Sequence, residues 1–158
     1  MIDIKSIIEG LSAGLTPLIA VVMTYIAYQQ WCTNKSRLTH ELYDRRLAVF
    51  KAVRAFYGEM GDAGTAKYGM VMRFYAATAE ADFLFGDDIR KHIEELYTKG
   101  MNLASLHEKM YPSSGGPGLP GGSERSKVAD EHGKLLLWFL QDAVAETRQM
   151  FRKYLRVD

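Results

Sequence analysis

The residues of this sequence with the clearest capacity for chemistry are one arginine and one histidine near its C-terminal end. Six residues separate Arg125 from His132. Seven positions make about two turns of an α-helix, so the two side chains would lie on the same helix face. The pair is either part of an active site or two solvated surface side chains, and the second interpretation is the simpler one.

Two other histidines stand at helical spacing from an acid. His40 with Asp44, and His92 with Glu95, could each provide two metal ligands, but a protein site needs three or four. We therefore expect surface residues, no metal and no cofactor. The sequence also lacks a glycine-rich phosphate loop, a nucleophile elbow and an acyl-transfer triad. Its single cysteine, Cys32, excludes an internal disulfide framework.

An uncharged run of twenty-five residues lies between Glu9 and Lys35. As a helix the run would be roughly 37 Å long, enough to cross a hydrocarbon core of about 30 Å. A cleaved signal peptide and a buried core helix are the alternatives. Tyr25, Tyr28 and Trp31 gather at one end of the run, as aromatic side chains do at the membrane surface, and they favour a transmembrane helix.

The charges that flank this run predict its orientation. Residues 35–54 carry six basic and two acidic side chains, whereas residues 1–9 carry one basic and two acidic ones. Basic flanks stay in the cytoplasm. The sequence thus predicts a protein that crosses the membrane once, with the N-terminus outside and a cytoplasmic domain at 35–158. The overall charge of +1 does not favour nucleic acid as a partner.

The cytoplasmic part is expected to be entirely helical. Apolar residues recur at steps of three and four, and no strand-like alternation occurs. We predict an all-α fold in which the transmembrane helix, within residues 1–34, continues into a bundle of about four helices. The first should stop near Gly58, the second should span about residues 66–85, and Gly86, Asp87 and Asp88 should supply a break and the N-cap of the third. A flexible loop is expected at 112–122, followed by a last helix capped by Ser123 or Ser126.

Small and polar residues recur about every four positions along the predicted transmembrane helix. Such a stripe permits close helix packing in a bilayer, and in an oligomer it could line a pore. A dimer and a lone anchor are the alternatives. The predicted pore-lining or packing residues are Ser12, Thr16, Ala20, Thr24, Ala27, Gln30 and Asn34.

The charged residues that follow the run have two predicted roles. Lys35 and Arg37 would form a collar that meets anionic lipid headgroups. Asp44, Arg45 and Arg46 would form an ion-pair node between the long helix and its neighbours. The membrane lipids and further copies of the chain are therefore the expected partners.

Four segments resemble a widespread family of small bacterial membrane proteins with no settled activity. They are YQQWCTNKSRLTHELYDRRLAVFKAV at 28–53, EADFLFGDDIRKHIEELY at 80–97, LLLWFLQ at 135–141 and FRKYLRVD at 151–158. Within them LYDRR and FLFG are the most specific pieces. This resemblance implies a shared structure more than a shared chemistry.

In length and topology the chain is also similar to the accessory membrane proteins of type VI CRISPR systems. The spacing of Arg125 and His132 resembles the Arg-x(4–6)-His signature of HEPN ribonucleases, in which the pair acts at an RNA phosphate. Ser126 departs from that signature, which prefers an amide, an acid or a histidine after the arginine. This resemblance implies a homo-oligomeric pore in antiviral defence that acts with a cytoplasmic defence protein. The alternatives are a membrane-tethered ribonuclease that uses Arg125 and His132, and a non-catalytic anchor for a cytoplasmic partner.

Overall fold

The structure is a computed structural model that describes the backbone of residues 4–156. Side chains are described for residues 19–156, apart from Ser36 and Thr39. All regular structure in this range is helical, as the sequence predicts. The chain divides into two compact units, Met1–Leu42 and Tyr43–Asp158.

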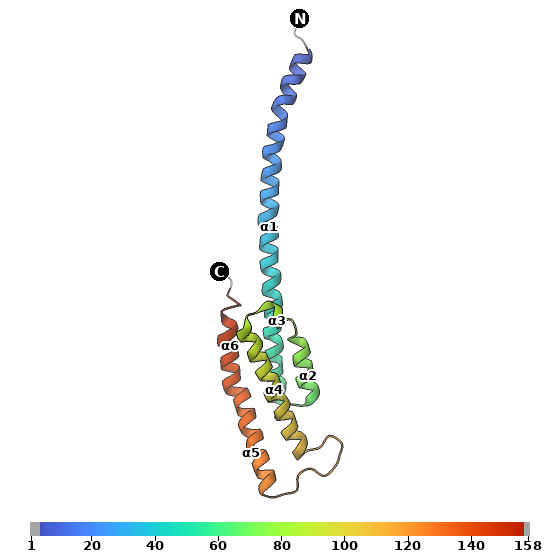
Figure 1. Cartoon of the computed structure of the whole chain (residues 1–158), viewed down its shortest axis with the longest axis vertical. Coiled ribbons are helices and arrows are strands. Elements are labelled where there is room, and N and C mark those ends of the chain that lie inside the picture. The colour runs from blue at the N-terminus through green and yellow to red at the C-terminus, as the bar shows by residue number, and fades with distance from the viewer. Residues whose placement is uncertain (1–3, 157–158) are drawn as a thin grey trace. The chain divides into compact units, whose positions relative to one another are not determined.

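One long helix, α1 (Ile4–Ala63), begins the chain (Figure 1). The prediction that it stops near Gly58 is wrong, because the helix continues for another turn. Glycine is a weak helix former, but Tyr57 and Met60 are buried in the bundle, and their packing outweighs the local preference. The helix ends before Gly64, whose φ of 64° is the left-handed conformation typical of a helix C-terminus.

The predicted transmembrane helix is only partly covered by the described side chains. From Ile19 onward, no helix has a segment both long enough and apolar enough to cross a membrane. Residues 10–18 of the predicted span lie outside the described side chains.

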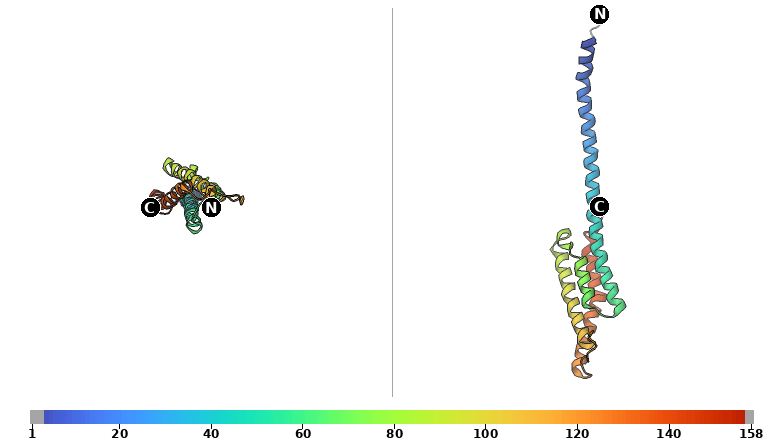
Figure 2. Two further views of the ribbon diagram at one scale, coloured as in Figure 1. Left: turned by 90° about the horizontal axis from the view of Figure 1, so that it is seen from below. Right: turned by 90° about the vertical axis from the view of Figure 1, so that its right-hand side faces the viewer.

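The second unit is a helical bundle. Figures 1 and 2 show α2, α4 and the α5–α6 segment side by side with the last part of α1. An unbroken helical path leads from α5 through the π-helical turn η1 into α6, since every backbone angle at the two junctions is α-helical. The elements after α1 are α2 (Tyr68–Ala77), α3 (Ala81–Leu84), α4 (Asp87–Met110), α5 (Ser123–Trp138), η1 (Phe139–Ala143) and α6 (Val144–Arg152).

Two of the predicted boundaries need correction. The expected second helix is broken into α2 and α3, and Thr78 closes α2 by donating its hydroxyl to the carbonyl oxygen of Phe74 at 3.0 Å. Gly122 rather than a serine is the N-cap of α5, whereas the N-cap of α4 is Gly86, one of the three residues predicted to supply it. Glycine is itself a favourable N-cap residue, although it has no side chain to accept from the first N–H groups of a helix.

Aromatic rings from three elements form the centre of the bundle. Phe56 of α1 stacks on Phe74 of α2 with ring centroids 4.3 Å apart, and its edge meets Phe139 of η1 at 6.0 Å. Gly100 makes this packing possible, because a Cβ there would lie 3.2 Å from the ring of Phe56 and 3.3 Å from Val71. The glycine thus lets α4 approach α1 and α2 closely.

The segment between α4 and α5 includes the predicted flexible loop at 112–122. The Glu108 carboxylate accepts from the backbone N–H and the hydroxyl of Ser113, at 2.7 and 2.6 Å. The N–H of Leu119 donates to the carbonyl oxygen of Lys109 at 3.1 Å. Gly118 lies so close to Met110 that a Cβ would be 2.1 Å from the carbonyl oxygen of that residue. The loop is therefore attached to the end of α4, and its flexibility stays a prediction.

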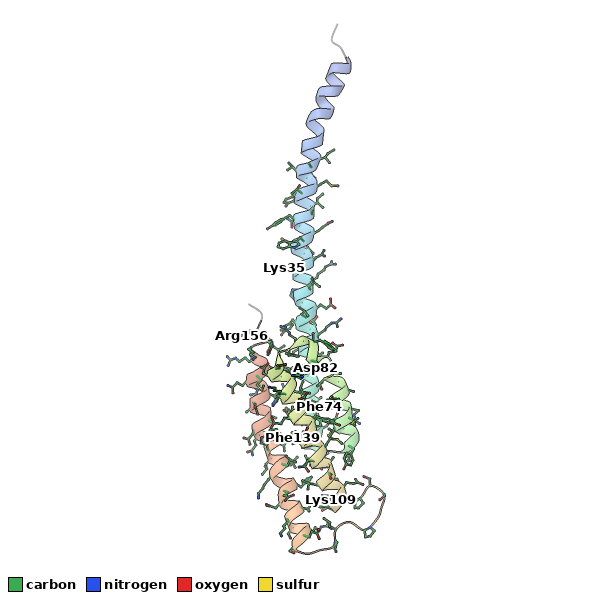
Figure 3. All side chains as sticks on the ribbon, in the orientation of Figure 1. Lys35, Phe74, Asp82, Lys109, Phe139 and Arg156 are labelled. Atoms are coloured by element: carbon green, nitrogen blue, oxygen red, sulfur yellow. The ribbon has the colours of Figure 1, made fainter. Side chains whose placement is uncertain are left out.

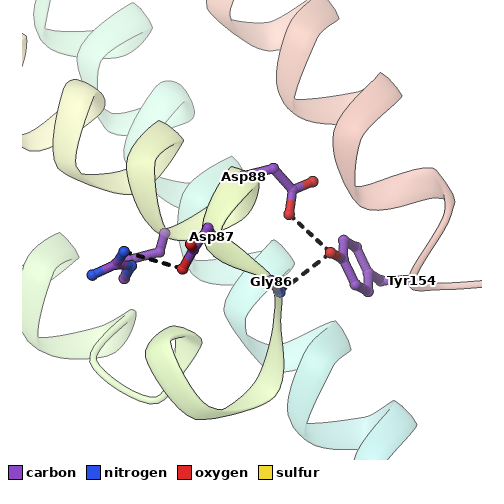
Figure 4. Close-up of polar contacts among 5 residues, drawn as sticks. Gly86, Asp87, Asp88 and Tyr154 are labelled. Atoms are coloured by element: carbon purple, nitrogen blue, oxygen red, sulfur yellow. Dashed lines mark hydrogen bonds and ion pairs between the residues drawn. The ribbon is translucent and has the colours of Figure 1, made fainter.

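Tyr154 joins the C-terminal end of α6 to the start of α4 (Figure 4). Its hydroxyl donates to Asp88 at 2.8 Å and accepts from the N–H of Gly86 at 3.2 Å. Lys153 pairs with the other oxygen of Asp88 at 2.5 Å and holds the pKa of that carboxyl below its usual value. Arg46 of α1 lies over the ring of Tyr154 at 5.6 Å and donates to the carbonyl oxygen of Leu84 at 3.0 Å.

The predicted ion-pair node lies next to these contacts. Arg45 is 3.8 Å from the Glu80 carboxylate, and both side chains are largely exposed, so the pair adds little stability. Asp44 is exposed. Arg46 makes the buried contacts of the three, and these are to a carbonyl group and aromatic rings.

Candidate functional site

The first unit presents large apolar side chains on every side of α1 (Figure 3). Successive residues of a helix are about 100° apart, so these positions cover its whole circumference. Their exposed fractions run from 43% to 68%. A helix that is apolar all round is normally covered, either by a protein core or by lipid. The eight side chains are Ile19, Val21, Val22, Met23, Tyr25, Ile26, Tyr28 and Trp31.

The predicted polar stripe is described from Ala20 onward, and the side chains of Ser12 and Thr16 lie outside the described residues. Thr24 donates its hydroxyl to the carbonyl oxygen of Ala20 at 2.8 Å, so this hydroxyl is satisfied within the helix. The remaining stripe residues, Ala27, Gln30 and Asn34, are exposed. The amides of Gln30 and Asn34 would need partners outside the helix in an apolar surrounding.

The two predicted collar residues lie on the same unit. Lys35 and Arg37 are exposed, and the ammonium of Lys35 is 5.5 Å from the centre of the Trp31 ring. A cation beside an indole ring is the pairing found where a helix meets a headgroup layer. The geometry is compatible with the predicted collar.

In the bundle, Arg125 and His132 have separate contacts. The guanidinium of Arg125 donates to the carbonyl oxygen of Leu119 at 2.7 Å and lies 5.1 Å from the centre of the Tyr111 ring. It thereby fastens the loop that precedes α5. His132 shares a hydrogen bond of 3.0 Å with the hydroxyl of Thr65. Each of the two side chains is thus used in joining elements of the bundle.

His132 also lies near a second histidine. The ring centroids of His132 and His107 are 5.9 Å apart. Burial lowers the pKa of His132, and the neighbouring charge of His107 lowers it further. A largely neutral His132 near pH 7 can accept a proton, as a general base does. No contact joins it to Arg125 in the part of the chain that the structure describes.

A buried polar chain crosses the interior of the bundle. The Tyr57 hydroxyl donates to the carbonyl oxygen of Ala143 at 3.3 Å and lies 2.7 Å from the Thr147 hydroxyl, which is in turn 2.7 Å from Nε2 of His92. Because Tyr57 has only one hydroxyl proton, the consistent assignment is that Thr147 donates to Tyr57 and Nε2 of His92 donates to Thr147.

This assignment leaves one ring nitrogen without a partner. Nδ1 of His92 is buried and has no hydrogen-bond partner among the described residues. Burial lowers the pKa of His92, against the opposing charges of Glu146 and Glu95. Burial likewise raises the pKa of Tyr57. Both groups are therefore neutral near pH 7. The hydrogen-bonded side chains of Tyr57, Thr147 and His92 are polar but uncharged within the core.

The sequence prediction that His92 is a surface residue is wrong. Its exposed fraction is 3%. The signal that could have identified it is the helical period of α4, since His92 stands between Ile89 and Leu96 on the buried face. The carbonyl partner, Ala143, is the last residue of the π-helical turn, and such turns have no simple sequence signature.

No group of three or more potential metal ligands occurs within the described residues. Comparisons of this chain with protein families, with curated proteins and with solved structures found no match. Function must therefore be argued from the exposed apolar surface of α1 and from the chemistry of the bundle.

Proposed function

We propose that this chain is a membrane-anchored protein in which the first part of α1 crosses a bacterial inner membrane once and the helical bundle is a cytoplasmic binding or assembly module. The observation that carries the proposal is the ring of exposed apolar side chains from Ile19 to Trp31. Such a surface is costly in water and favourable in lipid. The sequence extends it backward, because no charge occurs between Glu9 and Lys35.

The first test is membrane binding of matched lysine variants of the full-length chain. A lysine at the centre of a transmembrane helix costs roughly 2.5–3.5 kcal/mol. Val22→Lys should therefore reduce co-flotation with vesicles of phosphatidylethanolamine and phosphatidylglycerol by about 50-fold or more. Leu137→Lys is the control, because Leu137 is a comparably exposed apolar residue on the bundle. It should float like the unchanged chain.

Two outcomes would contradict the anchor. An unchanged chain that stays in the aqueous fraction, or that alkaline carbonate removes from the vesicles, does not cross the membrane. Equal flotation of Val22→Lys and the unchanged chain would show that another surface binds the lipid. If the unchanged chain is instead a stable soluble oligomer and Val22→Lys dissociates it, other copies of the chain rather than lipid cover α1.

The orientation is tested separately by protease access. The basic side chains that follow Asn34 support a cytoplasmic bundle, because basic flanks are retained on that side of the membrane. Trypsin should therefore leave the bundle intact in spheroplasts and digest it after lysis. Digestion in intact spheroplasts would reverse the orientation.

Pore formation by several copies is the second candidate. The exposed amides of Gln30 and Asn34 favour it, because they need water or a neighbouring helix once the surface around them is covered. By the resemblance to accessory proteins of type VI CRISPR systems, such a pore would serve antiviral defence. Light scattering in detergent, corrected for bound detergent, should then give a mass of several copies.

A conductance test separates the pore from the simple anchor. Replacing Thr16 and Thr24 with leucine, or Gln30 and Asn34 with leucine, should abolish release of potassium from loaded vesicles while the oligomer persists. Val21→Leu, which only enlarges an exposed apolar side chain, is the control. Unchanged release from both double variants would exclude a path lined by this stripe.

The runner-up activity is RNA cleavage by Arg125 and His132. It predicts that the purified chain cleaves single-stranded RNA and that His132→Ala stops the cleavage. An unchanged chain that leaves RNA intact would exclude it. The loop contact of Arg125 supports a structural role instead.

A further inference from the structure

A groove on the bundle lies between the last part of α1 and the η1–α6 segment. Its volume is about 240 Å³. Phe50 of α1 and Leu140 and Val144 of the opposite segment form apolar walls. The groove is smaller than the roughly 300–1,000 Å³ of most ligand pockets, so its ligand must be small.

Two arginines stand at this groove, one from each side. Arg54 belongs to α1 and Arg148 to α6, and both side chains are exposed. Neither forms an ion pair with an acid among the residues that the structure describes. Two like charges on one groove repel each other, and an anion between them removes that repulsion and gains charge-assisted hydrogen bonds.

The polar groups deeper in the groove are already occupied. The hydroxyls of Tyr57 and Thr147 line it but bond to each other, to Ala143 and to His92. The groove therefore offers a ligand apolar walls and two cations, and few other polar partners. That combination selects an anion with an apolar body over a sugar, a nucleotide base or a peptide backbone.

Gly58 keeps part of the groove empty. It lines the groove, and a Cβ built on it would meet no atom within 4 Å. A larger side chain at this position can therefore enter the groove without disturbing the helix. A larger residue at position 58 can therefore be used to block the groove with its own side chain.

We propose that this groove is a binding site for a small free carboxylate with a short apolar or aromatic body, whose carboxylate group lies between Arg54 and Arg148. Guanidinium groups bind carboxylates through charge-assisted hydrogen bonds, and the phenyl ring of Phe50 provides a surface for the ligand's body. The site is independent of the membrane anchor, because all its residues belong to the bundle.

The test is calorimetric titration of the full-length chain in a mild detergent with 3-phenylpropionate. Two analogues of the same shape, 3-phenylpropanamide and 3-phenylpropylamine, replace the negative charge with no charge and with a positive charge. We expect a Kd of about 0.1–1 mM for the carboxylate. The amide should bind at least tenfold more weakly, and the amine should not bind.

Matched variants locate the binding. Arg54→Gln and Arg148→Gln should each weaken carboxylate binding about tenfold or more, whereas Arg152→Gln, an exposed arginine of α6 outside the groove, should not. Gly58→Leu should abolish binding with the helical signal retained. Gly133→Leu is its control, since Gly133 is a helical glycine with equally open surroundings away from the groove.

Several results would overturn the proposal. They are absence of carboxylate binding to the unchanged chain, equal binding of the carboxylate and the amide, and unchanged binding in Gly58→Leu. If Gly58→Leu changes the number of copies seen by light scattering and no carboxylate binds, the groove is instead an interface between copies. The arginine variants keep the test decisive even if Gly58→Leu fails to fold.

Discussion

The residues of α1 from Ile19 to Trp31 and those after Tyr43 belong to one helix but have opposite surroundings. Between Ile19 and Trp31 the large apolar side chains point in every direction and are exposed. After Tyr43 they form a stripe of buried residues that includes Val49, Val53, Phe56 and Met60. The other helices of the bundle cover the buried stripe. No described part of the chain covers the exposed apolar side chains. The distribution of apolar residues around a helix therefore distinguishes an internal partner from an external one.

The sharpest test of this contrast is truncation of a large ring in each region. Phe139 is fully buried and touches Phe56 and Tyr57, so Phe139→Ala should lower the free energy of unfolding by about 3–5 kcal/mol. Tyr25→Ala, at an exposed position, should change it by less than about 0.5 kcal/mol. Denaturation followed by Trp138 fluorescence in a Trp31→Phe background measures both. Equal losses would show that both regions are packed alike.

Adding bulk at Gly100 should have the next largest effect. A Cβ at this position already crowds Phe56 and Val71, so Gly100→Leu should cost about 1–3 kcal/mol by overpacking. Gly133→Leu has open surroundings and gains helix propensity, so it should be neutral or stabilising. Thermal unfolding followed by circular dichroism measures the difference. A stabilised Gly100→Leu would mean that α4 can move away from α1 and α2 without loss of stability.

Two threonines test the contrast for polar groups. Thr147→Val removes the buried hydroxyl between Tyr57 and His92 and should cost about 1–3 kcal/mol, because both partners remain buried. Thr24→Val removes only a bond to the preceding helical turn at an exposed site, and should change stability by less than about 0.5 kcal/mol. Urea denaturation provides both values. A similar small loss at both sites would show that the buried hydrogen bonds of Thr147 do not stabilise the bundle.

The smallest expected effect is a pH dependence of the bundle. Burial lowers the folded-state pKa of His92, so between that pKa and about 6.5 the unfolded chain binds more protons than the folded one. The free energy of unfolding should therefore fall as the pH drops below about 6.5, by at most about 1.4 kcal/mol per pH unit. His132, whose pKa is also lowered, acts in the same direction but is partly solvated.

The pH prediction is checked by urea denaturation between pH 7.5 and 4.8. His92→Gln should reduce the slope, whatever its effect on absolute stability. Asp88 and Glu108 act in the same direction, but their contributions are lost mainly below their ordinary pKa values of 3.8 and 4.5, so they affect only the acidic end of this range. Stability that rises as the pH falls from 6.5 would contradict the assignment of a neutral buried His92.

The spacing of apolar residues was sufficient to predict the helical class and the approximate positions of α1, α4 and the α5–α6 segment. It failed where tertiary packing outweighs local preference. The last turn of α1 passes through Gly58 because its neighbours are buried. The N-cap of α5 is Gly122 rather than either of the predicted serines. Leu38 and Leu42 continue the apolar period of the helix, yet both are exposed.

The candidate sites also differ in whether the sequence or the tertiary structure identifies them. Composition and charge alone identify the uncharged run and the basic residues after it, because both are properties of residue type along the chain. Only the tertiary structure brings Tyr57, Thr147 and His92 together, and only it brings Arg54 and Arg148 to one groove. These residues lie far apart in the sequence, and no local pattern predicts which turns of two helices will face each other. The sequence determines the local conformational and burial preference of each residue. Packing between distant segments determines which of these preferences are satisfied in the fold.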